Sequence, residues 1–302
     1  MKKLFILFLF CLFCGYANAS SITITVYDCQ IDSHYIGNSI TQIVITPSIS
    51  DTQTQSDTTT YYTNTSTMPH GDNIRGWWTG DDVSGTTVID TSNFGFSGTV
   101  MNGVSLNSPG IVDNCFYLDG VDDYIDFGDK DEFTYASGFS FNVWIKSDST
   151  NEFMQLLSKR GANSSVSEHS FRVGWGESIH QTYFLLQQAS GSDNSISVTN
   201  DPPAGIDFMD NQWHMVTITY DGGTSISGMK IYDNGVQVNN GSDIGGSFGY
   251  LVNTATSFYL GYCVLYPDNK FKGYMDEATI WNARVLEQDD INKLYSNGNP
   301  KR

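Results

Sequence analysis

Short runs of alternating apolar and polar residues recur from about residue 73 to residue 298, separated by Gly, Asn, Asp and Ser. Alternation with a period of two places every second side chain on the same face, which is typical of β-strands with one face in a core. The repeated short spacing predicts an all-β sandwich. The strands expected from this pattern are residues 87–89, 115–118, 124–127, 139–146, 170–175, 182–187, 212–220, 229–232, 257–262 and 274–281.

The most informative run lies at residues 116–127 and predicts two strands joined by an acidic turn. Phe116 and Leu118 share a face in the first strand, and Ile125 and Phe127 share one in the second. A glycine in the turn adopts positive φ without strain, so we expect a β-hairpin. Its aspartates either fix the turn or bind a cation, and turn chemistry alone favours the first role. They are Asp119, Asp122, Asp123 and Asp126.

One segment follows a helical period instead. In residues 287–297, Ile291, Leu294 and Tyr295 fall on one face, and Gly298 is suited to follow a helix end. We therefore expect a single short helix after the last strand.

The first 19 residues have the features of a signal peptide. Lys2 and Lys3 precede an apolar stretch at residues 4–14, and Ala17-Asn18-Ala19 matches the small-residue cleavage pattern. No later apolar run reaches the roughly 20 residues needed to cross a bilayer. We expect cleavage near Ala19 and a mature chain that is secreted, periplasmic or on the cell surface, without insertion into the membrane.

Two further zones precede the sandwich. Residues 20–47 contain short alternating or β-branched runs at 22–26 and 40–45, which predict a small β-rich N-terminal element. Residues 48–72 are rich in Ser, Thr, Gln, Asp and Asn and offer little apolar surface to bury, so they are expected to form a linker. The main domain is expected at residues 73–298.

Charge and cysteine content narrow the chemistry. The formal net charge is −18, and it is more negative still once Lys2 and Lys3 are removed, so we expect no nucleic-acid partner. Cys29, Cys115 and Cys263 remain after cleavage, which permits at most one intrachain disulfide without indicating the pair. The five histidines are scattered, which argues against a histidine-rich metal site.

Six motifs in order resemble a LamG-like domain, of the laminin G and pentraxin-related group in the concanavalin A-like lectin/glucanase superfamily. Each motif is weak alone, but together they span nearly all of residues 73–298. They are Trp78 with Asp81-Asp82 and the run 84–90; Phe116 to Tyr124; Phe139 to Lys146 around Trp144; Trp213-His214 with Tyr220-Asp221-Gly222; Ile231 to Gly235; and Phe271 to Asn282 with Asp276-Glu277.

This resemblance implies a jelly-roll sandwich of two antiparallel sheets and a lectin-like role. It also implies a possible structural Ca²⁺, since such domains often bind calcium through aspartates and backbone carbonyls. Asp90 opens a loop similar to the family's calcium loop, although Asn93, Phe94 and Phe96 depart from it. With Asp276, Asp90 is the predicted metal site, because Ca²⁺ takes six to eight oxygen ligands. The alternative is that Asp276 and Glu277 cap strands or pair with a basic residue.

Sugar binding is the second candidate chemistry. Saccharides dock on exposed aromatic faces beside amides and carboxylates, because the C–H faces of sugar rings are apolar and their hydroxyls need directional partners. The ligand-binding residues we expect are Trp77, Trp175, Tyr266, Asp268 and Asn269. Further candidates are Tyr250, Tyr262, Gln187 and Asn194. Trp77 and Trp78 face opposite ways if they lie in one strand, and the resemblance assigns Trp78 to the core.

Catalysis is not expected. Retaining glycosidases hold two carboxylates about 5–5.5 Å apart, and an alternating acidic strand would supply them, but the chain has none. We therefore expect an exported, non-catalytic module that binds a glycan or an extracellular protein in carbohydrate recognition or adhesion. The alternatives are a structural subunit of an extracellular layer, assembled by strand addition through residues 22–47, and a polysaccharide-degrading enzyme.

Overall fold

The chain divides into two units, Met1–Thr67 and Met68–Arg302. The computed structural model describes residues 22–24, 43–45, 60–61 and 68–296, apart from residues 82, 93, 134–136, 151–152, 162–166, 174–181, 189–193, 201–206, 250 and 252. The predicted signal peptide and Cys29 lie outside the described residues.

In its described residues the first unit has three short strands. β1 (Ile22–Ile24) pairs in parallel with β2 (Ile43–Ile45), and β2 pairs antiparallel with β3 (Thr60–Tyr61). The first two strands fall in the runs expected to be β-rich. β3 falls within residues 48–72, whose composition predicts a linker.

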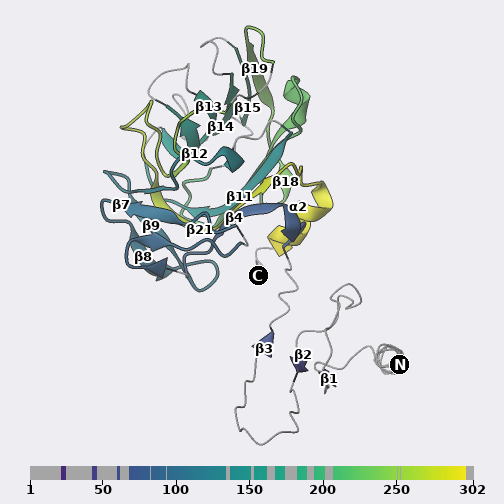
Figure 1. Ribbon diagram of the computed structural model, residues 1–302. Coiled ribbons are helices and arrows are strands. Elements are labelled where there is room, and N and C mark those ends of the chain that lie inside the picture. The colour runs from purple at the N-terminus through teal and green to yellow at the C-terminus, as the bar shows by residue number, and fades with distance from the viewer. Residues whose placement is uncertain are drawn as a thin grey trace, which may run out of the picture. The chain divides into compact units, whose positions relative to one another are not determined.

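Two large sheets make up the described part of the second unit, and Figure 1 shows them packed into a sandwich. We call the larger one, with ten strands among the described residues, sheet C. In spatial order it contains β19 (Gly241–Gly245), β15 (Ser195–Asn200), β14 (Thr182–Gln187), β13 (Ser167–Val173), β12 (Met154–Arg160), β20 (Tyr259–Leu260), β10 (Tyr124–Asp126), β7 (Gly98–Met101), β6 (Thr87–Val88) and β5 (Val83–Ser84).

We call the smaller one, with eight strands among the described residues, sheet B. The long strand β21 pairs with β11 on one side and with both β9 and β4 on the other. Neighbouring strands in both sheets run antiparallel. In spatial order sheet B contains β18 (Val236–Gln237), β17 (Met229–Asp233), β16 (His214–Tyr220), β11 (Phe139–Lys146), β21 (Lys272–Asn282), β9 (Asn114–Asp119) and β8 (Ser105–Pro109), with β4 (Ile74–Trp78) on β21.

The main core lies between the two sheets. On β11, Phe141 and Val143 point into it, while Trp144 points to the other side of the sheet. Phe171 and Phe184 reach the same core from sheet C. The strand alternation in the sequence therefore corresponds to one shared apolar interior, and the predicted jelly-roll sandwich of two antiparallel sheets is confirmed.

The predicted hairpin at residues 116–127 is wrong in its pairing. Both strands exist, but β9 pairs with β8 and β21 in sheet B, whereas β10 pairs with β7 and β20 in sheet C. The turn between them crosses from one sheet to the other. Phe116 and Leu118 therefore meet Ile125 across the core rather than beside it. The alternation is the same for a hairpin and for such a crossing, so the pattern alone does not separate them.

The predicted C-terminal helix is α2 (Gln288–Tyr295). Ile291 and Leu294 are buried, as the helical period predicts, in a second apolar cluster that also includes Trp144. The turns of 3₁₀ helix in the described residues are η2 (Gly71–Asn73), η3 (Asp131–Phe133) and η5 (Ile226–Gly228).

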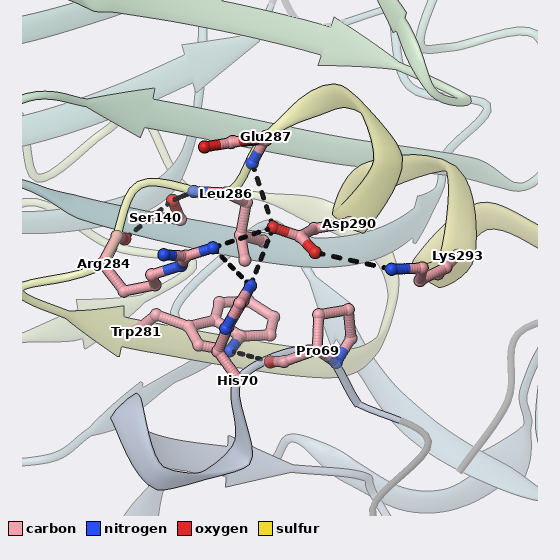
Figure 2. Close-up of polar contacts among 9 residues, drawn as sticks. All are labelled: Pro69, His70, Ser140, Trp281, Arg284, Leu286, Glu287, Asp290 and Lys293. Atoms are coloured by element: carbon pink, nitrogen blue, oxygen red, sulfur yellow. Dashed lines mark hydrogen bonds and ion pairs between the residues drawn. The ribbon is translucent and has the colours of Figure 1, made fainter.

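The second unit begins at Met68, five residues before the predicted start at residue 73. Figure 2 shows why residues 69 and 70 belong with the sandwich. The indole Nε1 of Trp281 donates to the carbonyl oxygen of Pro69 at 2.8 Å. His70 Nε2 lies 2.9 Å from Asp290 Oδ2 on α2, and Arg284 also contacts both of these side chains. The polar composition of residues 48–72 gave no indication that residues 68–72 attach to the sandwich.

Two further findings concern the described residues. Cys115 and Cys263 are buried and carry free thiols, so they do not form a disulfide with each other. In the same part of the chain no helix has the length and apolar character needed to cross a membrane.

Candidate functional site

Polar side chains lie on the face of sheet C that is turned away from the core. Phe171 on β13 and Phe184 on β14 point inward and are cross-strand partners. The next pair along, Arg172 and Tyr183, therefore points to the other face. The guanidinium carbon of Arg172 lies 4.7 Å from the centre of the Tyr183 ring.

A loop at residues 261–270 is attached to this outer face. The backbone N–H of Gln155 on β12 donates to the carbonyl of Asn269 at 2.9 Å, and the Ser158 hydroxyl donates to the carbonyl of Tyr262 at 2.7 Å. Within the loop, the Tyr266 N–H donates to Cys263 and the Asn269 N–H donates to Tyr266, both at 3.1 Å. These bonds hold the loop in one conformation with the Tyr266 side chain at the surface.

Tyr266 is the exposed aromatic residue of this region, with 37% of its surface accessible. Guanidinium groups lie against its ring: Arg172 at 5.3 Å and Arg160, at the end of β12, at 5.4 Å from the ring centre. Arg160 also donates to Oε1 of Gln187 at 2.8 Å. Cation–π contacts of this kind stabilise the orientation of the ring. We call the following seven residues the Tyr266 site: Arg160, Arg172, Tyr183, Gln187, Tyr266, Asp268 and Asn269.

The two arginines shape the electrostatics of the site. Both are nearly buried, at 5% and 2% exposed for Arg160 and Arg172. Burial, followed by the positive charge of Arg160, lowers the pKa of Arg172 to about 10. Arg172 therefore remains charged at neutral pH, and both arginines make further interactions within the chain.

More tyrosines continue the aromatic surface on the neighbouring strands. The rings of Tyr124 and Tyr262 stack with their centres 4.5 Å apart, and Tyr259 meets Tyr262 edge to face at 5.3 Å. Lys270 Nζ lies 5.7 Å from the Tyr262 ring centre. Burial raises the pKa of all three tyrosines, so their hydroxyls stay protonated and can donate hydrogen bonds.

The predicted ligand residues have three different outcomes in the structure. Tyr266, Asp268 and Asn269 lie together on the outer loop, with Asp268 exposed. Trp175 lies outside the described residues. Trp77 is only 7% exposed and belongs to the second apolar cluster, where its indole donates to Glu277 at 2.8 Å. The expectation that Trp77 offers an exposed face is therefore corrected.

The predicted metal ligand Asp90 is held by hydrogen-bond donors. Its Oδ1 accepts from the backbone N–H groups of Trp77 at 2.9 Å and Ser92 at 2.8 Å. Its Oδ2 accepts from the Ser92 hydroxyl at 2.7 Å and from the Phe96 N–H at 2.8 Å. Two donors on each oxygen fill the roughly four lone-pair sites of the carboxylate, so Asp90 acts as a brace for its loop.

The other predicted metal ligand, Asp276, is fully buried in β21 and also accepts from backbone donors. Its Oδ2 binds the N–H groups of Ile111 and Val112 at 2.9 and 3.1 Å, and its Oδ1 binds that of Glu277 at 2.8 Å. Burial and the neighbouring Glu277 nevertheless raise the pKa of Asp276 to about 8. The arrangement does not favour calcium at Asp90 and Asp276, and calcium there stays a prediction.

The acidic turn at residues 119–123 is the one group of three described carboxylates whose oxygens gather within 4.8 Å. Its aspartates are engaged within the turn itself. Asp119 Oδ1 accepts from the N–H of Val121 at 2.7 Å, and Asp123 Oδ2 accepts from the N–H of Asp119 at 3.0 Å. Gly120 has a φ of 77°, as the sequence predicts for this turn. These bonds fit the turn-fixing role.

Sequence reasoning missed three members of the site. Arg160 and Arg172 carry no motif, and Tyr183 sits in a run that predicts only a strand. A usable signal existed for Arg172, since it alternates with Phe171 and so must leave the core. For Arg160 the alternation gives no such signal, because the pairing of β12 with β13 shifts register between Lys159 and Arg160.

Two antiparallel sheets packed face to face around one core place the protein in the class of β-sandwiches. Within that class, residues 119–292 match the family model Laminin_G_3, described as the concanavalin A-like lectin/glucanases superfamily. This match covers more than half of the chain, and the protein belongs to that family. A comparison with curated proteins found no match.

Similar solved structures are binding domains of toxins. The binding domain of Paraclostridial Mosquitocidal Protein 1 is 16% identical with a TM-score of 0.56, over 75% of this chain and 52% of that one. The botulinum neurotoxin serotype D ligand-binding domain in complex with N-acetylneuraminic acid is 19% identical with a TM-score of 0.54, over 76% and 55%. At identities this low, the similarity shows that the folds are alike and nothing more. The chain spans about half the length of these structures.

Proposed function

We propose that the protein is a non-catalytic carbohydrate-binding module whose ligand docks at the Tyr266 site. The observation that carries this proposal is the exposed ring of Tyr266, braced by two guanidinium groups and flanked by Asp268 and Asn269 on the outer face of sheet C.

The chemistry of the site suits a sugar. The ring of Tyr266 offers an apolar face for the C–H groups of a pyranose, and a braced ring loses little conformational entropy when a ligand stacks on it. Asp268 and Asn269 provide an acceptor and an amide for hydroxyl groups, as is common in saccharide sites. The loop that carries them is tied to β12, so the site is formed before the ligand arrives.

Binding without hydrolysis is the second part of the proposal. Asp276 and Glu277 are adjacent acidic residues, but both are buried, at 0% and 4% exposed, and both accept hydrogen bonds from the protein. A glycosidase needs a pair of carboxylates that flank the substrate bond. Membership of a superfamily that includes glucanases leaves this open, and the similar toxin structures named above are binding domains.

A glycan array tests the proposal. The protein should retain at least one class of glycan, and Tyr266→Ala should weaken that binding about tenfold, since stacking on an aromatic ring contributes on the order of 1–2 kcal/mol. Tyr274→Ala is the matched control, because this half-buried tyrosine lies on sheet B against Tyr117. Equal loss in both variants, or no glycan bound, would reject the site. Release of reducing sugars from polysaccharides would reject the absence of catalysis.

Secretion or cell-surface placement follows from the predicted signal peptide and stays a prediction. So does a structural Ca²⁺, for which the test is thermal unfolding in calcium and in a chelator. If calcium is bound at Asp276, Asp276→Ala will lower the melting temperature more in calcium than in chelator. Equal losses in both would leave only the structural role that its hydrogen bonds describe.

A further inference from the structure

Positive charge is concentrated at the Tyr266 site in a strongly acidic protein. The formal net charge of the chain is −18, with 15 basic residues in all. Three of those 15 contact the neighbouring rings of Tyr262 and Tyr266: Arg160, Arg172 and Lys270. Orientation of Tyr266 alone does not require this concentration, since one cation suffices to brace a ring.

The two arginines are held in a manner that suits an anion. Both sit on the rigid strands β12 and β13 rather than on loops, and each lies within about 5.4 Å of the same ring centre. A negative charge on a ligand beside that ring is attracted by both positive charges at once.

We infer that the ligand of the Tyr266 site is an acidic glycan, one whose sugar carries a carboxylate, as uronic and sialic acids do. This inference rests on the proposed function. The sugar ring stacks on Tyr266 while Arg160 and Arg172 attract its carboxylate through the low-dielectric edge of the sheet. The exposed carboxylate of Asp268 opposes this attraction. A neutral sugar would use the same ring without the electrostatic contribution.

The experiment compares each acidic glycan with its own methyl ester, which keeps the ring and removes the charge. The probes are sialyllactose and tetragalacturonate, each as acid and as ester, with binding measured by calorimetry on the full chain. We expect at least one acid to bind about tenfold more tightly than its ester, the effect of two charges at roughly 8–9 Å in a medium intermediate between water and protein. Raising salt from about 50 to 500 mM should weaken only the acid.

Variants assign the effect to residues. Arg172→Gln should reduce the difference between acid and ester to about twofold while the ester still binds, because it removes one charge and leaves Tyr266 in place. Since this buried arginine also packs on Tyr183, the exposed variant Asp268→Asn is the complementary measurement. It should raise the ratio of acid affinity to ester affinity about twofold to threefold, because the opposing charge is removed while the amide oxygen still accepts from hydroxyl groups.

The outcomes separate the two proposals. Tighter binding of acids, erased by salt and changed in opposite directions by the two variants, supports the inference. Equal binding of acids and esters, both lost in Tyr266→Ala, overturns the inference and leaves carbohydrate binding intact. If no probe of either kind binds and a neutral glycan array is also blank, the proposed function fails, and the inference fails with it.

Discussion

The outer faces of the two sheets follow the same alternation but end in different environments. On sheet B the outward residues Trp144 and Trp281 are buried, at 2% and 0% exposed, beneath α2 and the first residues of the unit. On sheet C the outward residues include Arg172 and Tyr183, and the cover is a short loop that presents Tyr266.

The difference lies in what each face can do. The outer face of sheet B is a second apolar core, so its aromatic residues contribute stability and are closed to ligands. The outer face of sheet C carries charge, amides and the ring of Tyr266, which is exposed to solvent. An aromatic residue that points away from the main core is therefore a ligand candidate only after its cover is known, as Trp77 demonstrates.

The largest expected effect is on the outer face of sheet B. Trp77→Ala should lower the free energy of unfolding by about 3–5 kcal/mol, because it leaves a cavity and removes the indole donor to Glu277. Urea denaturation measures this loss. Glycan binding by the folded fraction should be unchanged. A loss of stability below about 1 kcal/mol, or a specific loss of binding, would mean that Trp77 belongs to a ligand surface after all.

The second prediction concerns the buried Asp276. Because its pKa in the folded state is about 8, above the value near 3.9 of an unfolded aspartate, the folded state binds the proton more tightly between these values. Its contribution to stability is therefore fully present below about pH 4 and is lost as pH rises toward 8.

Asp276→Asn mimics the protonated form and should flatten that dependence. Between about pH 5 and pH 8 the unmodified protein should lose on the order of 2 kcal/mol more than the variant, measured by urea denaturation at several pH values. If the free energies of unfolding of the two proteins change with pH in parallel, the three backbone donors keep Asp276 ionised in the folded state.

Much of the fold was accessible from the sequence, for a physical reason. β11 reads as clean alternation, since Phe141 and Val143 face one core and Asn142 and Trp144 face the other side. β12 was missed because Leu156 and Leu157 are adjacent and buried, and because Arg160 is a buried charge. A β-bulge breaks the period that a pattern depends on.

The site was only partly accessible for a related reason. Tyr266 was found because it lies in a predicted loop, outside the alternating pattern of the core strands. Arg172 was missed, because its place beside Tyr183 depends on the register of the two strands. Trp77 was assigned to a ligand surface because alternation sends it out of the main core. One part of the cover over the outer face of sheet B, the segment that begins at Met68, lay in a polar zone predicted to be a linker.

The third prediction tests how that segment is attached. Burial alone would raise the pKa of Asp290, but hydrogen bonds from His70 and from the backbone N–H of Glu287 lower it, with Arg284 adding to the effect. Asp290→Asn should therefore cost about 1 kcal/mol near neutral pH, and less as the pH falls below about 3.9, where the carboxylate of the unmodified protein is progressively protonated. Urea denaturation at neutral and acidic pH measures both.

Lys293→Ala is the control, because its Nζ is 3.9 Å from Asp290 and largely exposed. Equal costs in the two variants would contradict the attachment shown in Figure 2.

The smallest expected effect on stability is on the outer face of sheet C. Tyr266→Ala should change the free energy of unfolding by less than about 1 kcal/mol, because the ring is 37% exposed and its loop is held by backbone hydrogen bonds that the substitution keeps. The same variant is expected to lose glycan binding, so stability and binding separate here, whereas in Trp77→Ala only stability falls. If Tyr266→Ala instead destabilises the protein as strongly as Trp77→Ala, the ring supports the packing of two buried arginines, and the outer face of sheet C is a second polar core rather than a binding surface.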